Sequence, residues 1–380
     1  MPKQYFEIAG IGQTKFGELY DYSLADLITE ATNLALDDAG CELGEIDAVF
    51  IGNMIGGEAT TQSHLGAVFS ELYNYNGPVL RVEGACASGG LASYSALLGL
   101  KAGQYKNVLV LGVEKMTDYD AGRVGEFLMQ AASQEERDAG LSFPGLYALM
   151  TKSYMQQYGL SRDELSLVPV LMHKNALNNP KAQFHKEFTV EQINNSTKVA
   201  DPLRLLDCSP ITDGACAIVI KAVDKVSPNK AYLLDAEVAT DTANLAVREN
   251  HFSIKATRLA TSKLLQRADL SPSQINVVEL HDCFSIALLM ALEDMGITES
   301  GKSIDLVKKI LDGKSDFILN PSGGLKACGH PVGATGVKQI AEVAKSMNKS
   351  DKTQIGLAHN VGGSGGTSVV SLIVNSNFLA

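Results

Sequence analysis

Short apolar runs alternate with stretches of helical periodicity along most of the chain. Apolar runs bounded by turn-forming residues are typical of buried strands, and amphipathic stretches between them are typical of helices that cover a sheet. The pattern predicts strands at 5–11, 46–52, 79–83, 107–114, 214–222, 231–238, 275–280, 317–320, 353–359 and 367–375. This alternation predicts an α/β fold with mostly parallel, buried sheets.

The same plan occurs twice in the chain. Residues 34–49 and residues 263–278 both read as a helix end, a turn and an apolar strand. Helical stretches that begin at Cys86 and at Gly333 are each followed, after the same number of residues, by another apolar strand. A period this long excludes a solenoid and indicates two similar α/β halves.

A long segment interrupts this plan between 116 and 207, where Gly, Pro, Asn and several helical pieces replace the alternation. Such a length is typical of an inserted subdomain rather than a loop. We therefore expect an N-terminal half at 1–115 and 208–225, an inserted loop subdomain at 116–207 and a C-terminal half at 226–380. Several methionines of the insertion are interpreted as core filling, although methionine also lines adaptable pockets: Met129, Met150, Met155 and Met172.

Composition limits the function classes. The chain has 380 residues, 45% hydrophobic content and a net charge of -11, which allows a large core and argues against general nucleic-acid binding. No apolar run has the length of a membrane span and neither end carries a recognisable targeting signal, so we expect a cytoplasmic protein. The six cysteines form no Cys-x-x-Cys pair, so neither a zinc site nor a disulfide framework is expected.

Cys86 lies in the first of four motifs, at 83–90, where an apolar strand leads through a tight turn into a helix. At a helix N-terminus the dipole and the free amides favour a thiolate over a thiol. The N–H of Cys86 can also hold an oxyanion. Cys86 is therefore a candidate nucleophile. The alternative is a buried cysteine in a contact between small-residue helices.

The second motif, His281-Asp282-Cys283-Phe284, directly follows the strand predicted at 275–280. Ligands of open α/β sheets bind beyond the carboxyl ends of the strands, which makes His281 and Cys283 candidates for chemistry. The alternative is a polar strand end that caps the following helix through Asp282.

The third motif, at 320–336, is so rich in glycine that it demands tight turns and close backbone approach. It holds His330 between Gly329 and Pro331, which fixes the backbone of the histidine. We interpret His330 as a catalytic base or oxyanion donor rather than a surface residue, and Cys328 as packing. The spacing fits neither a phosphate loop nor a dinucleotide fingerprint.

The fourth motif, at 359–366, again follows a strand and contains consecutive glycines. Their amides can form an anion-binding concavity, and the same residues fit a tight turn before the last strand, so both roles can coexist. All four motifs fall at strand ends of a duplicated fold. We therefore expect them to converge near the join of the two halves.

Together these motifs resemble the thiolase family. The Cys-Ala-Ser-Gly-Gly turn at Cys86, the Gly-His-Pro around His330 and the terminal glycine-rich hairpin match three thiolase fingerprints in order, and the similarity covers essentially the whole chain. Ordinary thiolases carry Asn-Glu-Ala-Phe at His281 and Cys-x-Gly at Asn360. In both departures this chain is similar to thiolases of the sterol-carrier-protein (SCP2) type and to archaeal acetoacetyl-CoA thiolases. We do not assign the role of the missing last-loop cysteine to Asn360. The resemblance implies mixed five-stranded sheets in an α-β-α-β-α arrangement.

The resemblance also implies an activity: reversible Claisen condensation of two acetyl-CoA to acetoacetyl-CoA and CoA, or thiolysis of 3-ketoacyl-CoA. His330 would take the proton of Cys86, and the thiolate would attack a thioester to give an acyl-enzyme. Cys283 would remove an α-proton from a second acetyl-CoA, and His281 with His330 would stabilise the enolate. The amides of Cys86 and Gly362, together with His330, are the implied oxyanion donors.

The implied ligands are acetyl-CoA and other acyl-CoA thioesters, with no tightly bound cofactor and no metal. The family resemblance implies a homodimer or homotetramer. For archaeal relatives it also implies a complex with HMG-CoA synthase and a small zinc/OB-fold protein. Neither nucleic acid nor a membrane is an expected partner. The CoA-contacting residues stay undefined, with charge alone suggesting basic residues of the insertion: Arg123, Lys152 and Lys174.

Three other functions use similar residues. A 3-ketoacyl synthase pairs a cysteine with two histidines on this fold but loads from acyl-carrier protein. An HMG-CoA-synthase-like condensing enzyme needs a glutamate base, and the chain offers Glu83, which its strand position does not aim well. A catalytically weak lipid carrier or scaffold would not need the intact cysteines and histidines of the motifs.

Overall fold

The computed structural model describes residues 4–348 and 352–379, so 1–3, 349–351 and 380 of the predicted halves lie outside the described residues. The strands are β1 (Tyr5–Gln13), β2 (Ala48–Gly52), β3 (Val79–Val82), β4 (Asn107–Glu114), β5 (Lys198–Ala200), β6 (Leu203–Arg204), β7 (Gly214–Val223), β8 (Ala231–Thr240), β9 (Val277–Glu279), β10 (Ile318–Leu319), β11 (Ile355–Gly362) and β12 (Thr367–Asn375). The α-helices are α1 (Leu24–Ala39), α2 (Gly56–Ala59), α3 (Leu65–Tyr73), α4 (Ser88–Lys101), α5 (Ala121–Leu128), α6 (Gln134–Asp138), α7 (Phe143–Tyr158), α8 (Arg162–Ala176), α9 (Val190–Asn194), α10 (Lys255–Ala268), α11 (Ser285–Asp294), α12 (Ser303–Leu311), α13 (Gly324–Cys328), α14 (Thr335–Met347) and α15 (Ser376–Leu379).

The main sheet repeats one strand order. Over the described residues its order is β10-β9-β11-β12-β8-β1-β7-β4-β2-β3. The N-terminal half, β3-β2-β4-β7-β1, therefore repeats as β10-β9-β11-β12-β8. In each half one strand, β7 or β12, runs antiparallel to its neighbours, and the other pairs are parallel. Two similar halves are confirmed, and in the described chain they join at β1 and β8 through Glu7 opposite Tyr232.

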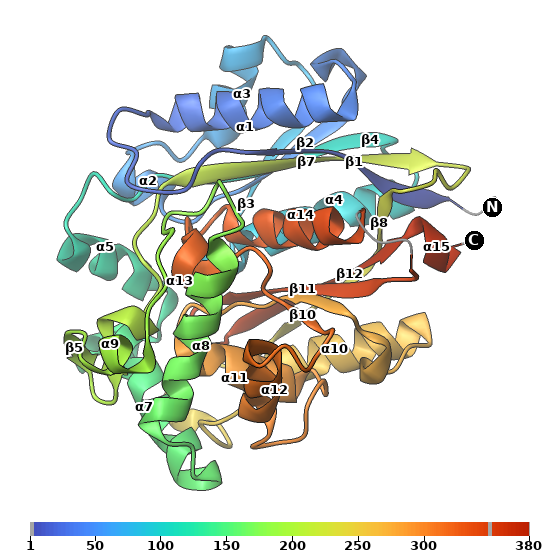
Figure 1. Ribbon diagram of the computed structural model, residues 1–380. Helices are drawn as coiled ribbons and strands as arrows, with labels where there is room; N and C mark the ends of the chain where they lie inside the picture. The colour runs from blue at the N-terminus through green and yellow to red at the C-terminus, as the bar shows by residue number, and fades with distance from the viewer. Residues whose placement is uncertain (1–3, 349–351, 380) are drawn as a thin grey trace.

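The elements stack in the predicted α-β-α-β-α order (Figure 1). Helices α1 and α3 cover the outer face of the N-terminal half of the sheet, and α4 and α14 lie between its two halves. Helix α10 covers the C-terminal half, with α11 beside it and α12 packed against α11. Helix α1 begins at a capping box of Ser23 and Asp26 and buries one apolar stripe. Helix α14 is buried on nearly all sides, because a sheet lies on each side of it.

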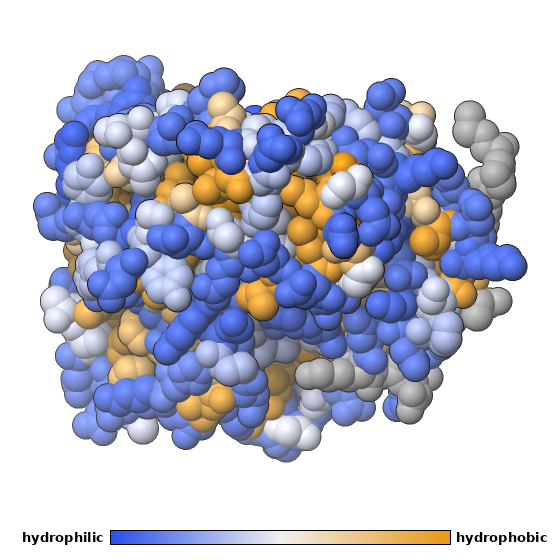
Figure 2. Space-filling view, turned by 90° about the horizontal axis from the view of Figure 1, so that it is seen from above, coloured by the Kyte–Doolittle hydropathy of each residue, from blue (hydrophilic) through white to orange (hydrophobic). Residues whose placement is uncertain are grey.

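The outer face above α1 and α3 is covered mainly by hydrophilic residues, with apolar residues in separate patches (Figure 2). This is the expected distribution for a layer that faces water. In the described part of the chain, none of the helices combines the length and the apolar character that crossing a membrane requires.

The central helices begin very close together, and glycine makes the approach feasible. A Cβ atom on Gly89 would lie 2.6 Å from the carbonyl oxygen of Gly333, and one on Gly336 would lie 2.1 Å from the nitrogen of Gly90. Any side chain at these positions would push α4 and α14 apart. The glycines of the first and third motifs therefore bring the two motifs into contact.

The segment between β4 and β7 carries α5 to α9 and the small β5–β6 sheet. Its helices α7 and α8 pack against α11, α12 and α13 of the C-terminal half. Met150 and Met172 are fully buried in this packing, as core filling requires. The domain bounds drawn at 116–207 stay a prediction.

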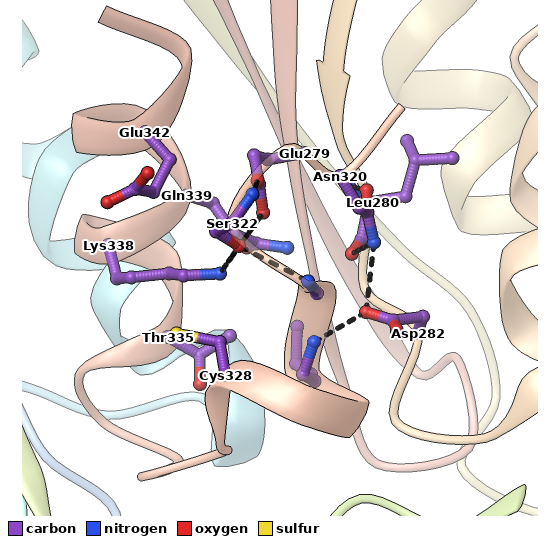
Figure 3. A network of polar contacts seen from close by, with 12 residues as sticks. Glu279, Leu280, Asp282, Asn320, Ser322, Cys328, Thr335, Lys338, Gln339 and Glu342 are labelled. Carbon is purple, nitrogen blue, oxygen red and sulfur yellow. Dashed lines mark hydrogen bonds and ion pairs between the residues drawn. The ribbon is translucent and has the colours of Figure 1, made fainter. Parts of the chain in front are cut away.

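A buried ion pair joins α14 to β9 (Figure 3). Lys338 Nζ lies 3.1 Å from Glu279 Oε2, and the two side chains are 1% and 0% exposed. Ser322 donates to the same carboxylate from its N–H at 2.9 Å and its hydroxyl at 3.0 Å. The carboxylate of Glu279 thus neutralises a lysine that has no access to water, and it orders the start of the third motif.

Replacing Glu279 with alanine is expected to lower the free energy of unfolding by about 3–5 kcal/mol, because it leaves Lys338 charged and unpaired in the core. Urea unfolding measures the change. Asp312→Ala is the matched control: it breaks the pair of Asp312 with Lys314, whose side chains are 56% and 71% exposed, and should cost less than about 1 kcal/mol. Equal small losses for both variants would contradict the assignment.

Candidate active site

Cys86 lies in a short 3-10 turn, Ala85–Ala87, directly before α4. Ala85 has a φ of 54°, which is uncommon for a residue with a side chain. Ser88 braces the turn, since its hydroxyl donates to the Ala85 carbonyl at 2.6 Å and accepts from the Gly84 N–H at 3.0 Å. Exposed Glu83 accepts from the Ala85 N–H at 2.6 Å. That carboxylate caps the turn, which disfavours a role for it as a base.

His330 is held through two threonine hydroxyls. Its N–H donates to the Thr212 hydroxyl at 3.0 Å. Its Nδ1 lies 2.7 Å from the hydroxyl of Thr335, and that hydroxyl donates to the Pro331 carbonyl at 3.0 Å. A hydroxyl has one hydrogen, so Thr335 must accept from Nδ1–H of His330. The Nε2 atom of His330 is therefore left with a free lone pair, the form that a general base needs.

His281 and Cys283 follow β9, as the strand pattern predicts. Nδ1 of His281 lies 3.2 Å from Nδ2 of Asn360, while its Nε2 is buried without a hydrogen-bond partner among the described residues. Asp282 accepts from the Leu325 N–H at 2.7 Å (Figure 3). Asp282 therefore bonds the first turn of α13.

The structure brings three predicted site residues together. The sulfur of Cys86 and one ring nitrogen each of His281 and His330 lie within 4.8 Å of one another. The two rings meet edge to face with their centroids 5.1 Å apart. The distances among these three atoms would also suit a metal ion. A metal binds only to atoms with a free lone pair, which requires a deprotonated thiol and unprotonated ring nitrogens. The expectation of a metal-free site stays a prediction.

Burial controls the charges in this cluster. It raises the pKa of the Cys86 thiol to about 12, although the amides of Gly363 and of Cys86 itself lower it. Burial lowers the pKa of His330 to about 3, helped by the charge of Lys338, and it lowers the pKa of His281 well below its usual range. The free site therefore holds a neutral thiol and neutral imidazoles, and the helix amides do not produce a thiolate by themselves.

A far-ultraviolet titration that subtracts Cys86→Ser from the native protein is expected to show no Cys86 thiolate between about pH 6 and pH 9. The pKa of about 12 places ionisation above this range. Absorbance should increase only at the alkaline end. A thiolate step near neutral pH would instead indicate a resident thiolate–imidazolium pair.

Tyr147 joins the two cysteines of the site. Its hydroxyl donates to the Gly363 carbonyl at 3.2 Å and lies beside Cys283. Its ring stacks on Phe284, with the centroids 4.4 Å apart. Burial raises the pKa of the Cys283 thiol, while the neighbouring Tyr147 hydroxyl lowers it. Sequence reasoning missed Tyr147, because nothing in its helix singles out one tyrosine.

Glu114 ties the loop of His330 to the N-terminal half. Its carboxylate accepts from the Gly333 N–H at 3.0 Å and from the Met54 N–H at 2.9 Å. Burial raises the pKa of Glu114 to about 7, although these amides lower it. Sequence reasoning missed Glu114, because its place at the end of a strand was the only signal for it.

The last-loop amides lie beside the nucleophile. The Gly363 N–H hydrogen-bonds the sulfur of Cys86. Gly362, the predicted donor, ends β11 opposite Thr367, and its role stays a prediction. A cavity of about 670 Å³ is lined by both glycines and by Gly84 and Ala85 of the nucleophile turn. This volume is within the range of ligand pockets.

Other sequence candidates lie away from the cluster. Cys328 is fully buried, as packing requires. Arg123 pairs with Glu126 at 2.5 Å and Lys152 pairs with Asp201 at 3.1 Å on the surface. Nothing in these contacts assigns either side chain to CoA phosphates.

This fold, with a cysteine that faces two histidines, defines a thiolase-type enzyme. A profile of the thiolase N-terminal domain matches residues 7–224, and a thiolase C-terminal domain-like profile matches residues 238–375. The chain belongs to the thiolase family.

Named relatives extend over the whole chain. The protein named acetyl-CoA acetyltransferase of Methanothermobacter thermautotrophicus is 42% identical over 379 residues, covering 96% of this chain and 98% of the relative. Human sterol carrier protein 2 is 30% identical over 396 residues, covering 96% of this chain and 71% of that protein. The solved structure titled Ltp2-ChsH2(DUF35) aldolase has a TM-score of 0.83 at 22% identity and covers 98% of both chains, which supports the fold.

Proposed function

We propose that this protein is an acetyl-CoA acetyltransferase, which condenses two acetyl-CoA to acetoacetyl-CoA and CoA and also catalyses thiolysis of 3-ketoacyl-CoA. The observation that carries the proposal is the cluster of Cys86 with two neutral imidazoles, linked through Gly363 and Tyr147 to a second thiol, Cys283. One thiol can act as the nucleophile and the other as acid and base. The relative at 42% identity that carries this name also supports it.

In the acylation step, Nε2 of His330 accepts the proton of Cys86 while the sulfur attacks the thioester carbonyl. The amides of Cys86 and of the last loop, with Gly362 as the predicted donor, hold the oxyanion. The intermediate collapses, the bond to the CoA sulfur breaks, and Cys283 gives its proton to the departing CoA thiolate. The products are the acyl-enzyme, CoA, a Cys283 thiolate and protonated His330.

In the condensation step, the Cys283 thiolate removes an α-proton from a second acetyl-CoA. The enolate oxygen is stabilised by His281 and by protonated His330. The enolate carbon attacks the acyl group, the bond to Cys86 breaks, and His330 returns the proton to the released sulfur. Every group is then back in its starting state, and the same steps in reverse give thiolysis.

Activity assays in both directions test the proposal, with acetoacetyl-CoA compared with longer 3-ketoacyl-CoA. Turnover of acetoacetyl-CoA with free CoA is the expected result. Turnover only with thioesters of acyl-carrier protein would instead indicate a ketoacyl synthase. Lipid binding without turnover would indicate a carrier.

We also propose that the protein acts in the cytoplasm as a homodimer or homotetramer, and in a complex with HMG-CoA synthase and a zinc/OB-fold protein if its source is archaeal. The family resemblance supports these assignments. Sedimentation of the purified protein tests the first, and co-purification from its own source tests the second. A monomer that retains full activity would contradict the oligomer.

A further inference from the structure

We propose that Asn360 is a positioning residue that fixes His281 in the tautomer with a proton on Nε2, so that His281 acts only as a hydrogen-bond donor in the reaction. This inference rests on the proposed function for its consequence, but the tautomer itself can be tested without substrate. Asn360 is buried, at 2% exposure, and lies near the end of β11 in the fourth motif.

Two backbone contacts determine which way the Asn360 amide points. Its Oδ1 accepts from the Gly90 N–H at 3.0 Å, and its Nδ2 donates to the Cys86 carbonyl at 2.9 Å. A backbone N–H can only donate and a carbonyl can only accept, so exchanging the oxygen and nitrogen of the amide would lose both bonds. The orientation is therefore fixed by groups whose polarity cannot change.

The second hydrogen of Nδ2 determines the tautomer of His281. Nδ2 lies 3.2 Å from Nδ1 of His281 and has only hydrogens to offer, so Nδ1 must accept with its lone pair. The ring proton then lies on Nε2. An imidazolium would place an N–H of the ring against the N–H of the amide, and burial also lowers the pKa of His281 well below its usual range. The neutral Nε2–H form is what remains.

This Nε2–H is the part of His281 left for chemistry. It is buried and has no hydrogen-bond partner among the residues that the structure describes. An unpaired buried donor is costly, and a carbonyl or enolate oxygen would satisfy it. His330 has the opposite tautomer, because Thr335 accepts from its Nδ1–H. One histidine is thus a donor and the other a base, and of these two rings His330 is the one with a free lone pair.

The fold provides the space for this amide. A Cβ atom on Gly336 would lie 2.3 Å from Oδ1 of Asn360, and one on Gly90 would lie 3.0 Å from the same oxygen. Two glycines of the central helices therefore leave room for one side chain from β11. The Nδ2 atom of this side chain therefore contacts both the backbone carbonyl of Cys86 and the ring of His281.

Nitrogen NMR of the native protein with isotope-labelled histidine tests the tautomer directly, with the His281 signal assigned by its loss in His281→Ala. A protonated Nε2 and an unprotonated Nδ1 are expected. A protonated Nδ1 would overturn the proposal even if the protein is a thiolase. A confirmed tautomer in a protein without acyl-transfer activity would instead remove only the proposed function.

The Asn360→Asp variant supplies a kinetic test. Its carboxylate cannot donate a hydrogen bond, so neutral His281 must carry its proton on Nδ1 and loses the Nε2–H donor. For that reason kcat at about pH 8 should fall on the order of 10²-fold. The carboxylate raises the pKa of His281, so the ring becomes protonated at lower pH. The imidazolium again has an Nε2–H, and kcat of the variant should therefore recover about tenfold toward pH 6. The native enzyme should show no such gain on acidification.

Asn375→Asp is the matched control, because buried Asn375 also bonds two backbone groups, at Lys352 and Gln354, but lies at the far end of β12. It should show no acid-side gain. In a double-mutant cycle, Asn360→Ala should lower kcat at least about tenfold more in the native background than in His281→Ala. Equal losses in both backgrounds, or an acid-side gain in both Asp variants, would overturn the proposal.

Discussion

Cys86→Ala is expected to lower acyl exchange between acetyl-CoA and labelled CoA by on the order of 10⁶-fold, as loss of a covalent nucleophile does elsewhere. The reason is specific to the site: Cys86 is the cysteine that contacts the Gly363 amide and lies within 4.8 Å of both imidazoles. Without its sulfur no acyl-enzyme can form, so thiolysis and condensation should disappear together. Steady-state exchange assays measure the loss.

The control for this variant is Cys328→Ala, which removes a buried thiol from the third motif, outside the cluster. It should keep exchange within a few-fold of the native rate, at some cost in stability from the small cavity. Acyl exchange that survives in Cys86→Ala would contradict the covalent mechanism. An equal loss in both variants would indicate a general loss of folding.

Cys283→Ala is expected to separate the two chemical steps. Condensation and thiolysis should fall by about 10²–10⁴-fold, the usual contribution of a general acid or base. Acylation of Cys86 should survive in part, because His330 still accepts the thiol proton while water can protonate the departing CoA. The measurement is a comparison of acyl-enzyme formation with acetoacetyl-CoA production in the same variant.

The matched control is Cys208→Ala, since Cys208 bonds the Arg204 carbonyl and takes no part in the cluster. It should leave the ratio of condensation to acylation unchanged. If Cys283→Ala lost acylation and condensation by the same factor, Cys283 would be a structural residue and another group would have to supply the base.

Hydrophobic alternation predicted the fold well, because short strands buried on both faces give strong local signals. β4 and β12 have the predicted bounds. β10, predicted at 317–320, is only Ile318–Leu319, because it is an edge strand paired with β9 alone within the described sheet. The pairing of β1 with β8 could not be predicted, since it depends on how the two halves meet.

The candidate site was predicted through residues that stand out locally: a cysteine in a glycine turn, a histidine after a strand, and a histidine between glycine and proline in a glycine-rich loop. Its supporting residues were missed for one physical reason. Tyr147 contacts Gly363, and Asn360 contacts Cys86 and His281. Each of these partners lies far away in the sequence, so the local pattern contains no trace of the contact. Asn360 lies in the fourth motif, but its proposed role depends on hydrogen bonds that the sequence does not show.

Trapping the covalent intermediate tests the central claim most directly. Cys283→Ala is mixed with labelled acetyl-CoA, quenched in acid and digested, and the labelled peptide is identified by mass spectrometry. The account predicts acetyl label on Cys86. Label on any other residue, or no label while acyl exchange continues, would contradict it.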